Sequence, residues 1–454
     1  MSTILKPRKH QQELMDFHHA SKMMGTLVWH DMGLGKTLSS LWMARRQIKN
    51  IRDQDPEGRV NPKFMVICPK SAELTWKAEC SKNTPDILNS MILAPFSQLH
   101  NLISRVKYAD IRFIIFDESH YIKSPSTNRV AHLAEMLKEI GSVNGEFDQG
   151  RLLCLTGTPM PNGAHEIFTS WCLCCAPNLM EAAKWLQDPL KYTQWKETFS
   201  QKKAKSFDRY DKTQGKKVKV ERSTHQGVAN EDMLNQILKE FVHHRQAEDC
   251  LDMPDKTPVY IDLNLPDDRL LADANIEEPE AYMALLERLS RAKAPYMFKW
   301  VKDFLDTTSE QLIVFSSYTT PLRELQEKHP KHVRVITGAE SGEERANAVR
   351  AFQAGELRCL SMSFKCGSES LNLQNSCHTL YHGYPWTDGG LRQAMARTYR
   401  SGQKRKSFHY FLTSGNNDQR ILGIVQRKAQ ATSTVQDLLK QNENIIITSL
   451  AQLV

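Results

Sequence analysis

The amino-acid sequence predicts an α/β protein of two lobes, each built on a parallel sheet, with a helical insertion after the first set of strands. A chain of 454 residues is too long for one hydrophobic core. Short apolar runs of strand length alternate with helical stretches up to about residue 160, and again from about residue 311. Between about residues 163 and 251 the strand pattern stops and helical spacing replaces it.

Composition narrows the class of protein. Hydrophobic residues make up 40% and charged residues 25%, which is typical of soluble globular proteins. No apolar run reaches the length of a membrane span and the start lacks a signal-peptide pattern, so we expect a cytoplasmic protein of a prokaryote or a host cell, without a membrane partner. The ten scattered cysteines suit reduced, buried thiols, and residues 172–175 read as core packing rather than a metal site. A net charge of +8 indicates an anionic partner, although many cytosolic proteins are basic.

A glycine-rich stretch at residues 31–37 lies between an apolar run, 25–29, and a helical segment, 38–48. Glycines in this context let the backbone turn tightly, so that its N–H groups point at phosphate oxygens. Lys36 would reach the β- and γ-phosphates, and the Thr37 hydroxyl would bind Mg²⁺. The full pattern has a glycine where His30 stands, so a glycine-rich turn before an ordinary helix is the alternative. The expected nucleotide-binding residues of this loop are Gly33, Leu34, Gly35, Lys36 and Thr37.

Gln11 precedes this loop by about twenty residues, in a polar segment at residues 5–14. Its amide is suited to read the edge of adenine through paired hydrogen bonds. The alternative is the exposed polar start of a helix.

Three further apolar strands end in polar residues, as ligand-binding strands of an open α/β sheet do. The strand at 64–68 delivers Lys70 and Ser71, where Ser71 is alternatively a helix cap. The strand at 111–116 delivers Asp117, which can hold Mg²⁺ through its water shell, and Glu118, which can polarise the attacking water as a general base. Acidic helix caps are the alternative. The strand at 152–155 leads into a turn at 156–162 that can sense phosphate, or that is only a tight turn.

The predicted insertion contains an amphipathic helix over 230–243, with Asn230 as its N-cap. Before it, residues 201–222 hold nine Lys or Arg against three acidic residues. This basic segment reads as a flexible or hairpin-like loop. A solvated charge run and a nucleic-acid contact explain it equally well.

A second sheet is predicted from strands at 311–316, 333–338, 360–363 and 379–384. Ser341 and Glu344 have capping-box spacing and begin a helix through Phe352. The segment 393–403 is expected to be helical in its first half, which places Arg397 and Arg400 on one helix face. Two such guanidiniums suit arginine fingers supplied by a second lobe.

These motifs, in this order, resemble the Swi/Snf family of DNA-translocating ATPases within helicase superfamily two, over about residues 8–439. In the first lobe the matching segments are the adenine-reading motif at 8–13, the phosphate loop at 31–37, a DNA-contacting motif at 67–71 with Trp76, the metal and base motif at 117–123, and the coupling motif at 155–159 with Asn162. In the second part they are 244–256, Gly338 with Arg345 and Phe352, 371–373 and 393–403. The chain departs from the family at Ser368 and Ser370, where glycines are usual, at Ala396 (usually Asp) and at Tyr399 (usually His).

The resemblance implies two RecA-like lobes that bind ATP and Mg²⁺ between them, in a minimal motor such as a bacterium or bacteriophage encodes. The expected boundaries are lobe 1 at 1–165, helical insertion at 166–250, return to lobe 1 and linker at 251–300, lobe 2 at 301–430, and a C-terminal helix or tail at 431–454. The implied catalytic residues are Lys36, Asp117, Glu118, Arg397 and Arg400, with Thr37 and Asp117 on the metal and Arg8 and Gln11 on the nucleotide. The implied DNA contacts are Lys70, Ser71, Trp76, Lys365 and Asn372.

The implied activity is ATP-driven translocation along duplex DNA that remodels protein–DNA complexes or branched DNA. The partner is duplex or branched DNA, held mainly by its phosphates and so without strong sequence preference. Whether a protein partner directs the chain to its target is left open. Two other readings remain: a strand-separating or strand-annealing helicase acting at forks, and an ATP-binding scaffold without turnover.

Overall fold

The computed structural model divides the chain into two compact units. The first comprises Met1–Cys250 with Lys428–Val454, and the second comprises Leu251–Arg427. The described residues are 5–106, 109–144, 150–211, 216–263, 265, 279–367, 371, 373–385, 388–415, 418–419, 421–423, 425–426, 432–437 and 439–440.

The first unit contains a six-stranded parallel sheet in the order β3-β2-β4-β5-β1-β8. Its strands are β1 Gly25–His30, β2 Lys63–Cys68, β3 Met91–Pro95, β4 Ile111–Asp117, β5 Leu152–Thr156 and β8 Val242–Arg245. The four strands predicted in this part of the sequence are present. Strands β3 and β8 were not predicted; β3 is an apolar run that the prediction missed, whereas β8 reads Val-His-His-Arg, without an apolar run.

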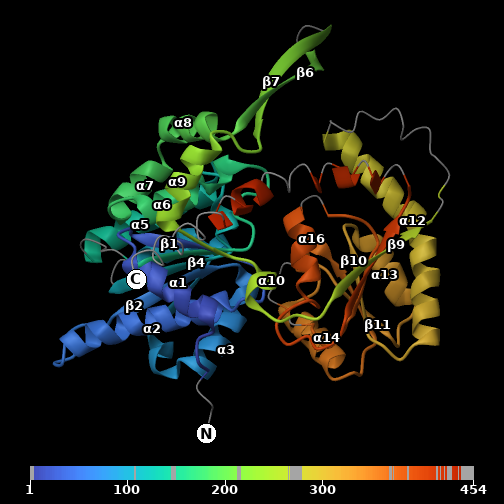
Figure 1. Ribbon diagram of the computed structural model, residues 1–454, viewed down its shortest axis with the longest axis horizontal. Coiled ribbons are helices and arrows are strands. Elements are labelled where there is room, and N and C mark those ends of the chain that lie inside the picture. Colours follow the sequence, from blue (N-terminus) through green and yellow to red (C-terminus); the bar gives the residue numbers. More distant parts are fainter. Residues whose placement is uncertain are drawn as a thin grey trace, which may run out of the picture. The chain divides into compact units, whose positions relative to one another are not determined.

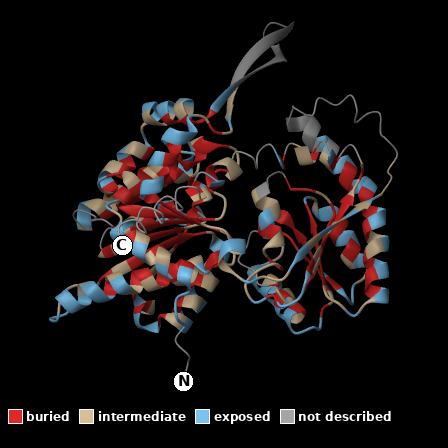
Figure 2. Cartoon of the chain, viewed as in Figure 1, coloured by how far each residue is buried: buried red, intermediate tan, exposed pale blue. Residues whose placement is uncertain are grey.

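The core of the first unit lies on both faces of this sheet. Along β1, Leu27 and Trp29 pack into one apolar cluster while Val28 packs into the other. Along β4, Phe116 and Ile115 divide in the same way. Figure 2 shows most of these strands as buried, whereas β3 is half-buried over its first three residues. Burial on both faces explains why these strands are continuous apolar runs rather than alternating ones.

Helices cover the sheet of the first unit (Figure 1). They are α1 Lys9–Ala20, α2 Lys36–Gln54, α3 Glu73–Asn83, α4 Leu99–Val106, α5 Asn128–Asn144, α6 Phe168–Cys175, α7 Leu179–Leu186, α8 Pro189–Phe199, α9 Glu231–Phe241 and α10 Ala247–Cys250. Short 3₁₀ turns include η1 Lys70–Ala72. Helices α6 to α9 occupy the stretch in which the sequence predicts an insertion.

The basic segment is a β-hairpin between α8 and α9 (Figure 1). Its strands β6 Gln201–Asp211 and β7 Lys216–Gln226 pair antiparallel, and Gln201 lies opposite Gln226. The hairpin alternative for this segment is therefore the observed one; its role stays a prediction. Asn230 is the N-cap of helix α9, as predicted, but its side chain makes no capping hydrogen bond. Asn230 has a φ of 49°, and its amide donates to the Thr198 carbonyl oxygen at 2.7 Å instead.

The second unit contains another six-stranded parallel sheet, in the order β11-β12-β10-β13-β14-β9. Its strands are β9 Lys256–Asp262, β10 Leu312–Ser316, β11 Val333–Ile336, β12 Cys359–Ser363, β13 His378–Tyr381 and β14 Ser407–Thr413. Its helices are α12 Pro279–Thr307, α13 Thr319–Lys328, α14 Gly342–Gln353, α15 Phe364–Gly367 and α16 Asp388–Met395. The predicted fold class, two parallel-sheet α/β lobes, is confirmed.

Two local expectations in the second unit have different outcomes. The capping box is present, since Ser341 Oγ accepts from the Glu344 N–H and Glu344 Oε2 accepts from the Ser341 N–H at 2.7 Å. The segment expected to return to the first lobe does not do so, because residues 251–300 belong to the second unit and supply its edge strand β9. Strand β9 lies at the edge of the sheet, and its residues alternate between exposed and half-buried. Its sequence therefore lacks the apolar run that is typical of the inner strands. None of the described helices is long and apolar enough to span a membrane.

Candidate functional site

The glycine-rich loop connects β1 to α2 and has the backbone geometry of an anion site. Gly33 and Gly35 have φ values of 85° and 74°, in the left-handed region that glycine adopts without strain. Gly35 is the N-cap of α2, so the first N–H groups of a 19-residue helix face the loop. The Lys36 ammonium folds back over the loop, donating to the carbonyl oxygens of His30 at 2.7 Å and Asp31 at 3.2 Å. The N–H groups at the start of a helix and a cation at one loop fit a phosphate group.

Helix α1 holds the loop in this shape. His10 Nε2 lies 3.0 Å from the Leu34 carbonyl oxygen, and Gln11 Nε2 donates to the Gly35 carbonyl oxygen at 3.4 Å. Gln11 Oε1 also accepts from the Arg8 N–H at 2.9 Å, and the side chain is 4% exposed. The amide predicted to read adenine thus supports the phosphate loop in this structure, and its contact with adenine stays a prediction.

Two buried histidines lie behind the loop. His30 Nε2 and His243 Nδ1 are 2.7 Å apart, because β8 pairs with β1 in parallel register. Burial lowers the pKa of His30 well below its usual range and that of His243 to about 3, so both rings are neutral at physiological pH. The cationic charge at the loop therefore comes from Lys36. Nothing in the sequence pointed to His243, since β8 has no strand-like pattern.

Asp117 and Glu118 end β4, which is separated from β1 by β5 alone. Asp117 Oδ2 accepts a hydrogen bond from Trp76 Nε1 at 2.7 Å. Burial, and next the neighbouring Glu118 carboxylate, raise the pKa of Asp117 to about 6, whereas Trp76 and Lys36 act in the opposite direction. A divalent cation at this place would relieve the cost of two adjacent carboxylates. Carboxylate and hydroxyl oxygens are the ligands that Mg²⁺ prefers, so Asp117 and Thr37 fit the metal chemically.

Glu118 is linked to the turn after β5. It has a φ of 51°, unusual for a residue with a side chain, and Oε2 lies 3.3 Å from His120 Nδ1. The same His120 nitrogen lies 3.2 Å from Thr156 Oγ1, which accepts from the Thr158 N–H at 3.0 Å. The predicted base and the predicted phosphate-sensing turn therefore share one histidine.

A second bridge joins the same two motifs. The Lys123 ammonium lies 2.6 Å from Glu166 Oε1, and Glu166 is 6% exposed on its side chain. Asn162 donates to the same carboxylate through its side chain at 2.7 Å and its backbone at 2.8 Å. Glu166 therefore connects the two motifs through an ion pair to Lys123 and hydrogen bonds from Asn162.

The predicted DNA contacts of the first unit separate into two kinds. Lys70 and Ser71 are exposed on the 3₁₀ turn η1, where a phosphate can approach them. Trp76 is only 1% exposed in this structure, and its contact with DNA stays a prediction. Helix α3 turns the indole into the core cluster under β2 and β4, and the N–H of the ring is bonded to Asp117.

Arg397 and Arg400 converge in the second unit, but not on a helix face as predicted. Helix α16 ends at Met395, and both arginines lie in the turns that follow it. Each guanidinium donates to the Leu371 carbonyl oxygen, Arg397 at 3.4 Å and Arg400 at 3.2 Å. The two arginines lie close together because of the conformation of these turns, and not because they share a helix face. Lys365 is exposed on α15, and Asn372 lies outside the described residues.

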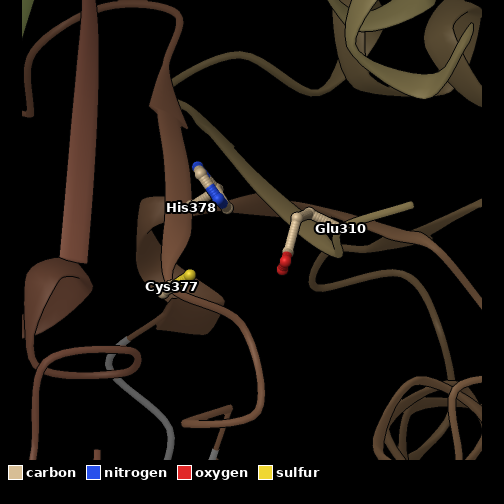
Figure 3. A group of neighbouring side chains, drawn as sticks. All are labelled: Glu310, Cys377 and His378. Atoms are coloured by element: carbon tan, nitrogen blue, oxygen red, sulfur yellow. The ribbon is translucent and has the colours of Figure 1, made fainter. Parts of the chain in front are cut away.

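Another cluster in the second unit has the residue types of a metal site. Glu310, Cys377 and His378 offer ligand atoms within 4.8 Å of one another, with the first contributed from beside β10 and the others from the start of β13 (Figure 3). Both carboxylate oxygens of Glu310, however, accept from Arg405 Nη1 at 2.9 and 2.8 Å. Burial raises the pKa of the Cys377 thiol, which favours the protonated form that does not bind metal. We therefore interpret this cluster as an ion pair packed against a buried thiol.

Comparisons with known proteins agree with these two units. Residues 10–100 match the SNF2-related domain, and residues 296–402 match the helicase conserved C-terminal domain. The DNA annealing helicase and endonuclease ZRANB3 of Bos taurus is 24% identical, over 90% of this chain and 38% of its own length. The SWI/SNF-related matrix-associated actin-dependent regulator of chromatin subfamily A-like protein 1 of Xenopus laevis is 23% identical, over 88% of this chain and 41% of its own length.

Among solved structures, the Sulfolobus solfataricus SWI2/SNF2 ATPase core in complex with dsDNA is similar at a TM-score of 0.36 and 19% identity, covering 96% of this chain and 95% of that one. The chain spans about two fifths of the length of the two curated relatives. The SNF2-related domain, the helicase C-terminal domain that follows it and these curated relatives show that the chain is similar to proteins of the Swi/Snf group of helicase superfamily two.

Proposed function

We propose that this chain is a DNA-dependent ATPase that uses ATP and Mg²⁺ to move along duplex DNA and thereby remodels protein–DNA complexes or branched DNA. One observation carries the proposal. Lys36, at the start of α2, and the Asp117–Glu118 pair, at the end of β4, lie at the carboxyl ends of strands in one parallel sheet. In such sheets this is the edge that binds ligands.

Each residue of this edge has a defined task in phosphoryl transfer. The loop N–H groups and Lys36 bind the β- and γ-phosphates of ATP, while Thr37 and Asp117 hold Mg²⁺. Mg²⁺, when bound, neutralises the charge that develops on the phosphate oxygens. Glu118 accepts the proton of the attacking water and is oriented by His120. Arg397 and Arg400 are proposed to stabilise the transition state as arginine fingers.

DNA binding is proposed for the turn η1 in the first unit. Lys70 and Ser71 are exposed there, and an ammonium and a hydroxyl suit phosphate oxygens rather than base edges. The net charge of +8 favours the same partner. Contacts of this kind position the duplex without reading its sequence, so we propose sequence-independent binding.

The experiment that tests the proposal measures ATP hydrolysis with duplex, single-stranded and forked DNA side by side. We expect duplex or forked DNA to stimulate the wild-type chain. Lys36→Ala should abolish turnover because the phosphate charge loses its partner. Glu118→Gln should bind ATP but hydrolyse it very slowly, since an amide is no base. Near-normal turnover in Glu118→Gln would contradict the role given to this residue, and no turnover in the wild type would support a nucleotide-binding scaffold.

A second candidate function is strand annealing or separation at forks, favoured by the name of the relative described as a DNA annealing helicase. A fluorescence assay on forked DNA separates the two functions. Strand displacement, or annealing of complementary strands, at rates comparable to ATP turnover would favour this alternative. ATP turnover on duplex DNA without either reaction supports translocation.

A further inference from the structure

The indole of Trp76 has a single hydrogen-bond donor, and this donor bonds to Asp117, the carboxylate that is proposed to bind the metal. The indole Nε1–H donates to Asp117 Oδ2 at 2.7 Å, a short distance for an N–H donor and a carboxylate acceptor. The ring is 1% exposed and packs in the apolar cluster that also contains Phe64 and Val66 of β2. A packed ring with one N–H has a single direction in which it donates, so the hydrogen bond is preorganised.

The hydrogen bond fixes how the carboxylate of Asp117 is turned. A carboxylate at a strand end can rotate about its last bond, and this rotation changes which oxygen faces a bound cation. With Oδ2 held by Trp76, the other oxygen keeps one orientation before any metal arrives. A partner that holds a metal ligand in place raises metal affinity, because the ligand loses less freedom on binding.

We propose that Trp76 is a positioning residue for the Mg²⁺ site: its N–H holds one oxygen of Asp117 and leaves the other directed at the metal. This inference rests on the proposed function, in which Asp117 binds Mg²⁺. It also gives a task to a residue whose place in a motif suggested a contact with DNA. Trp76 acts through Asp117 and does not touch the nucleotide.

The test measures metal affinity directly. Mn²⁺ replaces Mg²⁺ as a probe, and its free concentration is followed by electron paramagnetic resonance in the presence of the non-hydrolysable nucleotide AMP-PNP. Trp76→Phe keeps an aromatic ring but lacks the N–H. A hydrogen bond to a charged group is worth enough that we expect Mn²⁺ affinity to fall about tenfold. Affinity for AMP-PNP without metal should stay unchanged, because the phosphate loop is not altered.

The chain offers a matched control in Trp195. This side chain is also buried, at 5% exposed, and its Nε1–H donates at 3.1 Å, but to the backbone carbonyl of Ala164. Trp195→Phe removes a buried indole hydrogen bond in the same unit without touching Asp117. We expect wild-type Mn²⁺ affinity in this control. An equal loss in both variants would show a general effect of the substitution and overturn the inference.

A second replacement keeps the test valid if Trp76→Phe does not fold. Placing 3-benzothienylalanine at position 76 preserves the size of the ring and substitutes sulfur for the N–H. The same tenfold loss is expected. Unchanged Mn²⁺ affinity beside normal ATP turnover would overturn this inference alone. A wild-type chain that binds no Mn²⁺ with AMP-PNP would overturn both this inference and the proposed function.

Discussion

Gly35 joins the phosphate loop to α2, and a methyl group at this position would have two separate costs. The residue has a φ of +74°, and a Cβ built on it would lie 2.6 Å from Gln11 Nε2. An L-residue in this left-handed region costs about 1–2 kcal/mol. Gln11 must also move, which breaks its bonds to the Arg8 N–H and the Gly35 carbonyl oxygen, at about 0.5–1.5 kcal/mol for a typical bond.

The variant Gly58→Ala measures the first cost alone, which is the cost of an L-residue in the left-handed backbone region. Gly58 has a φ of +65°, and nothing lies within 4 Å of a Cβ at that position. We predict that Gly35→Ala lowers the free energy of unfolding by about 1–3 kcal/mol more than Gly58→Ala does, measured by urea denaturation. The Kd for a fluorescent ATP analogue should rise roughly tenfold in Gly35→Ala alone, since about 1.4 kcal/mol corresponds to a factor of ten.

A double-mutant cycle decides whether Gln11 is responsible. In the background of Gln11→Ala the obstacle is gone, so Gly35→Ala should cost only the backbone term. Equal costs of Gly35→Ala with and without Gln11, or equal costs of Gly35→Ala and Gly58→Ala, would refute the idea that α1 holds the loop through this amide.

Three further predictions concern the two arginines of the second unit, the basic hairpin and a buried histidine of the first unit. Arg400→Ala and Arg397→Ala should each lower ATP turnover on the order of 10³–10⁵-fold in a steady-state assay, and nucleotide affinity should change less. Wild-type turnover in both variants would exclude the arginine-finger role. Neutralising the basic hairpin should weaken duplex DNA binding and lower the log–log salt slope by about 0.9 for each lost contact, whereas an unchanged slope would favour a solvated charge run. The lysines to replace by Gln are Lys202, Lys203, Lys205, Lys216, Lys217 and Lys219. Acid should destabilise the first unit through His18, because burial lowers the pKa of this side chain to about 4. The unfolded chain takes up the proton as the pH falls below about 6.5, so the free energy of unfolding should fall by about 2 kcal/mol between pH 7 and 5. His18→Gln should reduce this pH dependence, measured by urea titrations at the two pH values.

Much of the fold was determined by the sequence alone, because inner strands of a parallel sheet are buried on both faces. The runs that became β1, β2, β4, β5, β10, β12 and β13 are apolar for that reason, and loops with ligand-binding chemistry follow several of them. The inner strand β14 was not predicted, because its residues alternate between buried and half-buried. Edge strands have no such constraint. Strands β8 and β9 are polar or alternating, so only pairing in three dimensions revealed them, and with β9 the boundary of the second unit.

The same distinction holds for the candidate site. Lys36, Asp117 and Glu118 were recognisable because their chemistry needs particular residue types directly after a buried strand. What holds them was not recognisable. The bond from Trp76 to Asp117 spans 41 residues of sequence, and residues that meet only through packing leave no periodic or spacing signal along the chain. The sequence therefore determined which groups are proposed to do the chemistry, and the tertiary structure decided which side chains contact them and how far Asp117 is buried, which raises its pKa.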